Sequence, residues 1–112
     1  MNEIEEITEA LLRFRNDRDW SQFHNTKNLA VALSIEASEL NELFLWKDVD
    51  ESENCDKEKI KEELADIFSY AFLIAEKHKL NVKQIVFDKI KLNEKKYPIA
   101  KAKGSSKKYN EL

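Results

Sequence analysis

The sequence is poor in residues that interrupt regular structure, with one glycine, one proline and one cysteine among 112 residues. So few turn formers disfavour a sheet of many short strands and favour long helices. A single glycine also excludes the glycine-rich phosphate loop, the dinucleotide fingerprint and the nucleophile elbow. We therefore predict an all-α fold, in which any phosphate group is bound by other means.

The lone cysteine, Cys55, lies in a polar stretch without a second cysteine or a neighbouring histidine. An internal disulfide and a Cys/His metal site are thus excluded, and a reducing, cytoplasmic compartment is expected. No apolar run approaches the roughly 18 residues needed to span a bilayer. Residues Met1–Glu9 include four acids and no basic residue, unlike a signal peptide. We expect no association with a membrane.

Apolar residues recur at helical spacing in four segments, and we predict one domain over residues 1–112. The predicted helices cover about Glu3–Arg18, Asn28–Lys47, Glu58–Lys79, and the stretch from after Asn81 to before Pro98. Because so short a helical chain exposes much apolar surface, oligomerisation is expected.

Polar residues mark the boundaries of these helices. Thr26 is a candidate N-cap of the second helix, and Asn81 with Gln84 resembles a capping box for the fourth. The acidic stretch Asp48–Asp56 is predicted to be an exposed connector. Residues 98–112 are predicted to form a basic, extended tail.

Four acids form two pairs at i, i+3 spacing, Glu36 with Glu39 and Glu63 with Asp66. At about 100° per residue they lie on or beside the apolar stripes of the second and third helices. A charge on a core-facing stripe is costly unless it is compensated, and a divalent cation is the simplest compensation for facing carboxylates. Carboxylate oxygens favour Mg²⁺ or Mn²⁺ over Zn²⁺ or copper.

The sequence pattern leaves two alternatives to this metal site. A di-iron bundle needs Glu-x-x-His pairs, and neither His24 nor His78 follows a glutamate by three positions. A non-catalytic helical interaction module is the second alternative, in which lysines or arginines of a partner helix pair with the inward acids. Magnesium dependence of stability would separate such a module from an enzyme.

Positive charge is concentrated near the carboxyl terminus, where residues Lys89–Lys108 include eight lysines and one acid, Glu94. Beside a metal site, such an arm suits a polyanionic small molecule better than duplex DNA. An ordinary solvated tail is the alternative.

Several aromatic residues offer flat faces for a nucleobase, although core packing explains each singly. Trp20 and His24 are less easily assigned to a core, because their loop is polar.

Longer motifs extend this pattern over nearly the whole chain. They are Arg18-Asp19-Trp20, Gln22-Phe23-His24, the run from Asn28-Leu29 to Glu36, Glu39-Leu40, Glu42-Leu43-Phe44, Trp46-Lys47, Glu62-Glu63-Leu64 with Asp66, Lys96-Tyr97-Pro98 and Lys108–Leu112. Together they resemble the MazG-like all-α nucleoside triphosphate pyrophosphohydrolases, with the dCTP pyrophosphatase branch as the nearest match. One departure is Ile35, where the general family pattern has a further glutamate.

The resemblance implies magnesium-dependent hydrolysis of a nucleoside triphosphate, dCTP or a related or modified one, to the monophosphate and pyrophosphate. It implies metal binding by Glu36, Glu39, Glu63 and Asp66, a nucleotide pocket of Trp20, His24, Trp46 and Tyr70, and contacts to phosphate or sugar from Lys89, Asn93, Lys96 and Tyr97. The implied assembly is a homotetramer, a dimer of dimers built from four-helix bundles. A role in nucleotide house-cleaning is also implied, with the range of bases left open.

Overall fold

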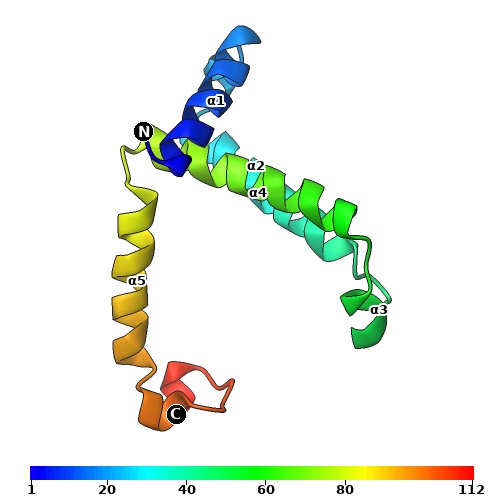
Figure 1. Ribbon diagram of the computed structural model, residues 1–112, viewed down its shortest axis with the longest axis vertical. Coiled ribbons are helices and arrows are strands. Elements are labelled where there is room, and N and C mark those ends of the chain that lie inside the picture. Colours follow the sequence, from blue (N-terminus) through cyan, green and yellow to red (C-terminus); the bar gives the residue numbers. More distant parts are fainter. The chain divides into compact units, whose positions relative to one another are not determined.

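The computed structural model describes residues 1–112, and all its regular elements are helices (Figure 1). The prediction of an all-α fold is therefore confirmed. The α-helices are α1 (Glu3–Asp17), α2 (Thr26–Glu42), α3 (Val49–Glu53), α4 (Lys57–Lys77), α5 (Val82–Lys96) and α6 (Ile99–Ala102), and the 3₁₀ helices are η1 (Ser21–Phe23) and η2 (Tyr109–Glu111). No helix is long and apolar enough to cross a membrane.

Each long helix begins at a polar residue whose side chain accepts a hydrogen bond from a backbone N–H of the first turn. These N-caps are Asn2, Asn25, Asp56 and Asn81. The prediction that Thr26 caps the second helix is wrong. Asn25 accepts from the backbone N–H of Asn28 at 2.8 Å, and Thr26 is the first helical residue. The Thr26 hydroxyl is thereby free for another contact.

Three other local predictions need correction. Helix α2 ends at Glu42 rather than near Lys47, and turns follow it. The connector predicted over Asp48–Asp56 contains α3, because Asp48 accepts a hydrogen bond from the Glu51 N–H at 2.8 Å and starts a helix. At α5 the N-cap Asn81 is correct, but the Gln84 amide donates to Asp88 at 2.8 Å instead of completing a capping box.

The carboxyl-terminal tail is also more regular than predicted. The prediction of an extended tail over residues 98–112 is corrected, because residues 99–102 form α6 and residues 109–111 form η2. The ring of Tyr109 packs edge-on against Tyr97, with 6.2 Å between ring centroids. These aromatic contacts hold the tail against the end of α5.

The chain divides into two compact units, residues 1–79 and residues 80–112. In the first unit α2 and α4 lie side by side, and α1 contacts α4 (Figure 1). Its buried side chains are Leu29 on α2, which is fully buried, with Leu73 and Ala75 on α4. The second unit contains α5, the fourth predicted long helix, and buries no side chain completely.

Candidate metal centre

Carboxylates of α2 and α4 meet at the interface of these two helices. One oxygen from each of Glu36, Glu39 and Glu63 can be chosen so that all three lie within 4.8 Å of one another. All three side chains are half-buried, whereas Asp66, one turn further along α4, is exposed. The i, i+3 spacing of each pair and the side-by-side packing of the helices together produce this cluster.

Two oxygens of the cluster lack any partner within the chain. Oε2 of Glu36 and Oε2 of Glu63 are both buried without a hydrogen bond. The ion pairs of the structure, Lys61–Glu58 and Lys79–Glu76, each join residues three positions apart and do not include an acid of the cluster. Buried carboxylate oxygens without donors or cations are unfavourable. The donor set therefore fits a hard divalent cation such as Mg²⁺ or Mn²⁺.

The close approach of the acids changes their proton affinity. Burial, followed by the neighbouring Glu39, Asp66 and Glu63 carboxyls, raises the pKa of Glu36 to about 7 from an ordinary 4.5. Burial and the Glu39 carboxyl likewise raise the pKa of Glu63. Both shifts show that the charged carboxylates are disfavoured without a counter-ion, and a cation bound at the cluster would favour them.

Tyr70 on α4 is close enough to sense the cluster. Burial raises the pKa of its phenol, and the negative charges of Glu36 and Asp66 raise it further. The phenol therefore stays neutral at physiological pH and keeps a proton that it can donate.

The loop between α1 and α2 contains Trp20 and His24. Trp20 is 43% exposed, and the ring of Phe14 meets it edge-on at 5.7 Å between centroids. Nδ1 of His24 is buried and has no hydrogen-bond partner. Burial and the nearby Arg15 charge lower the pKa of His24, which keeps the imidazole neutral. A neutral ring with a free nitrogen can bind a ligand by hydrogen bonding.

Trp46 lies in the turn after α2 and is 92% exposed. Its φ of 63° places it in the left-handed region, which is unfavourable for a bulky side chain. The core-packing alternative for Trp46 is therefore wrong. An exposed aromatic ring in a strained backbone conformation is a reasonable binding surface.

The remaining predicted site residues belong to the second unit. Lys89, Asn93 and Lys96 lie on one face of α5 at helical spacing, and Tyr97 follows the helix. The Lys96 ammonium lies 5.0 Å from the ring centroid of Tyr109. The lysines and Asn93 are exposed. The structure thus groups these four residues in a unit separate from the acids.

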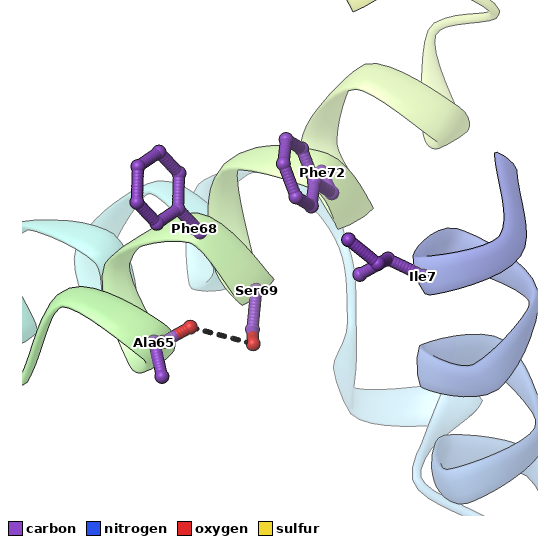
Figure 2. A pocket seen from close by; sticks show the side chains of 5 residues that line it. All are labelled: Ile7, Ala65, Phe68, Ser69 and Phe72. Atoms are coloured by element: carbon purple, nitrogen blue, oxygen red, sulfur yellow. Dashed lines mark hydrogen bonds between the residues drawn. The ribbon is translucent and has the colours of Figure 1, made fainter. Parts of the chain in front are cut away.

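The first unit also contains an apolar hollow. It measures about 430 Å³ and is lined by Ile7 of α1 and by residues of α4, which are Ala65, Phe68, Ser69 and Phe72 (Figure 2). The rings of Phe68 and Phe72 stack, with 5.9 Å between their centroids. On a helical wheel Phe68 lies well away from Glu63 and Asp66. This apolar hollow is therefore a different surface from the carboxylate cluster.

Sequence reasoning missed two interactions that join different structural elements. The positive charge of Arg15 on α1 lowers the pKa of His24 in the following loop. The Thr26 hydroxyl forms a hydrogen bond with His78, the C-cap residue of α4. Neither pair has a characteristic spacing, because each joins different structural elements. Only the histidines, which are rare in this chain, offered a signal.

Comparison with known proteins places these observations in a family. The sequence pattern of the MazG-like family matches residues 31–112, which include all four acids of the candidate metal centre. Among solved structures, the crystal structure of a pyrophosphatase from Archaeoglobus fulgidus is similar, with a TM-score of 0.83 and 36% identity. The match covers 88% of this chain and 94% of that one.

Curated relatives give a consistent result. The chain is 35% identical to dCTP pyrophosphatase 1 of Bos taurus over 88 residues, which is 74% of this chain and 52% of the relative. It is also 35% identical to dCTP pyrophosphatase 1 of Homo sapiens over 84 residues, covering 70% of this chain and 49% of the relative. The chain thus spans about half the length of the curated relatives that it matches.

Proposed function

The chain belongs to the MazG-like family, and on this premise we propose that it is a nucleoside triphosphate pyrophosphohydrolase. The substrate class is a deoxynucleoside or nucleoside triphosphate, with dCTP or a related modified nucleotide preferred. The products are the monophosphate and pyrophosphate. The observation that carries the proposal is the cluster of Glu36, Glu39 and Glu63 across α2 and α4, within the part that matches the family.

We assign the metal-binding role to these three acids together with Asp66. Mg²⁺ is the proposed ion, and Mn²⁺ can replace it, because the donors are carboxylates. A bound divalent ion supplies charge neutralisation and favours ionisation of water at such a site. The two buried oxygens without partners on Glu36 and Glu63 support this assignment.

The chain's own groups account for the remaining steps. One carboxylate accepts the proton of a water that attacks the α-phosphorus, and pyrophosphate is the leaving group. Lysines of the second unit neutralise the phosphate chain. We propose that Trp20, His24, Trp46 and Tyr70 bind the nucleoside, and that Lys89, Asn93, Lys96 and Tyr97 contact phosphate or sugar. The neutral imidazole of His24 and the exposed ring of Trp46 suit these roles.

We also propose that the chain acts as a homotetramer, assembled as a dimer of dimers. The apolar side chains of α5 support this, since Ile85, Val86 and Ile90 are 41%, 50% and 45% exposed. The first unit has 10 basic and 19 acidic residues, and the second has 9 basic and 3 acidic ones. Exposed apolar faces and opposite charges favour association of copies. The proposed role is nucleotide house-cleaning in the cytoplasm.

Pyrophosphate release from a panel of nucleoside triphosphates, with and without Mg²⁺, tests the function. The wild type should be compared with Glu39→Gln and with Glu42→Gln, an exposed control on the same helix. We expect magnesium-dependent release, strongest with dCTP and reduced at least ~10²-fold by Glu39→Gln alone. Lack of release from every nucleotide would contradict the proposal and favour the interaction module.

A further inference from the structure

The start of α2 and the end of α4 are joined by one side-chain hydrogen bond. Thr26 Oγ1 and His78 Nε2 lie 2.9 Å apart across these helices. Every other side-chain hydrogen bond of the structure joins residues at most five positions apart in the chain. The Thr26–His78 pair is therefore the only direct polar link between two long helices.

The local structure makes both groups available. Asn25 caps α2, which releases the Thr26 hydroxyl from the capping role. His78 is the C-cap residue of α4, and its ring extends from the last turn. A hydroxyl can either donate to or accept from an imidazole nitrogen, so the bond is compatible with both tautomers.

The Thr26–His78 pair and the carboxylate cluster lie on the same helix pair. Glu36 lies about three turns along α2 from Thr26, and Asp66 lies about three turns back along α4 from His78. The distance along each helix is roughly 15 Å to 18 Å. Because the helices run in opposite directions, a single register satisfies both the hydrogen bond and the approach of Glu36 to Glu63.

Full burial of apolar side chains in this helix pair is confined to one end. The buried side chains of α2 and α4 are Leu29, Leu73 and Ala75, all toward the end that carries the Thr26–His78 pair. Apolar contacts have no preferred direction, whereas the hydrogen bond between the exposed residues Thr26 and His78 requires a defined distance and angle between the two helices. At the cluster, the acids repel one another and favour separation of α2 from α4.

We infer that the Thr26–His78 pair is a positioning element that fixes the register of α2 on α4 and thereby the spacing of the metal-binding carboxylates. This inference rests on the proposed function, since it assumes that a divalent cation binds at the cluster. Both residues lie too far from the acids to touch the ion. They act through the two helices, and their loss should weaken metal binding without removing a ligand.

A pair of substitutions at residue 26 tests the role of the hydroxyl. Thr26→Val keeps the shape of the side chain and removes the hydrogen bond, whereas Thr26→Ser keeps the hydroxyl. Mg²⁺ and Mn²⁺ affinities of the full chain should be measured by calorimetry without nucleotide, well below the unfolding temperature. We expect roughly three- to tenfold weaker binding for Thr26→Val, in line with the loss of one hydrogen bond, and near wild-type binding for Thr26→Ser.

His78→Leu provides the reciprocal variant. Both substitutions remove the same hydrogen bond, so their effects should not add. The double variant Thr26→Val/His78→Leu should therefore have the same Mg²⁺ dissociation constant as whichever single variant binds Mg²⁺ less tightly. Ser38→Ala serves as a matched control, since the Ser38 hydroxyl donates only to the Ser34 carbonyl within α2. This control should keep wild-type affinity.

The kinetic readout separates positioning from general destabilisation. In Thr26→Val, the Mg²⁺ concentration for half-maximal activity should rise by the same factor as the dissociation constant, while kcat at saturating Mg²⁺ stays near wild type. Wild-type metal affinity in Thr26→Val, or equal losses in Thr26→Val and Thr26→Ser, would overturn the inference alone. A wild-type chain that binds neither Mg²⁺ nor Mn²⁺ would overturn the proposed function as well.

Discussion

A carboxylate oxygen of Glu36 on α2 lies within 4.8 Å of a carboxylate oxygen of Glu63 on α4. The Oε2 atom of each residue is buried and has no hydrogen-bond partner. Two acids in this relationship destabilise the metal-free chain and create affinity for a cation. A substitution that removes one of these charges should therefore stabilise the metal-free chain and weaken its affinity for the cation.

Glu36→Gln should stabilise the metal-free chain at pH 8, because it removes one of the charges that repel each other. We expect a rise of a few degrees in the unfolding temperature, measured by circular dichroism in the presence of EDTA. Glu42→Gln, exposed on the same helix, should leave the temperature nearly unchanged. A lower unfolding temperature for Glu36→Gln would contradict mutual repulsion in the cluster.

The stability of the metal-free chain should fall as pH rises from about 4.5 to about 7. Over this window folded Glu36, with its pKa raised to about 7, keeps a proton that the unfolded chain has lost. The folded state then binds more protons, so the free energy of unfolding decreases with pH and levels off above pH 7. Urea unfolding in EDTA at several pH values measures this slope. Glu36→Gln should flatten it.

Mg²⁺ should stabilise the wild-type chain by about 2.7 kcal/mol at a concentration one hundred times its dissociation constant. At one fixed Mg²⁺ concentration the stabilisation should be larger at pH 8 than at pH 6, because the carboxylate ligands bind the ion without their protons and the dissociation constant falls as pH rises. Thermal unfolding with Mg²⁺, compared with NaCl at equal ionic strength, measures it. If Mg²⁺ leaves the unfolding temperature unchanged at both pH values, the result would favour the interaction module, in which a protein partner pairs with the acids.

Deletion of Gly104–Leu112 should raise the KM for dCTP by at least about threefold, because it removes Lys107 and Lys108 as weak phosphate contacts. Steady-state kinetics at saturating Mg²⁺ measure the change. Lys107→Gln/Lys108→Gln separates charge from the packing of Tyr109 on Tyr97, which this double variant retains. An unchanged KM in the deletion would rule out a phosphate-binding role for the tail.

Ile85→Asp should reduce the size of the assembly, measured by light scattering after size-exclusion chromatography. Ile85 is 41% exposed on α5, and an acid within an apolar contact between copies is strongly unfavourable. Lys91→Gln is the matched control, because it changes the net charge by the same amount and residue 91 lies on another face of the same helix. Equal masses for wild type and Ile85→Asp would exclude this face from the interface between copies.

Local patterns in the sequence predicted the long helices well. The first helix was predicted to within one residue, and the N-cap role of Asn81 was predicted correctly. These features depend on residues a few positions apart, which sequence spacing specifies directly. The end of α2 was less accurate, because Leu43–Trp46 continue the apolar spacing while the backbone forms turns.

The sequence by itself determined the all-α class and the two i, i+3 carboxylate pairs, because both follow from the periodicity of a single helix. The tertiary structure decided that Glu36, Glu39 and Glu63 converge while Asp66 stays exposed, and that Thr26 bonds to His78 instead of capping its helix. These relationships depend on the register and packing of α2 on α4. Helical periodicity within one segment does not specify the register between two segments.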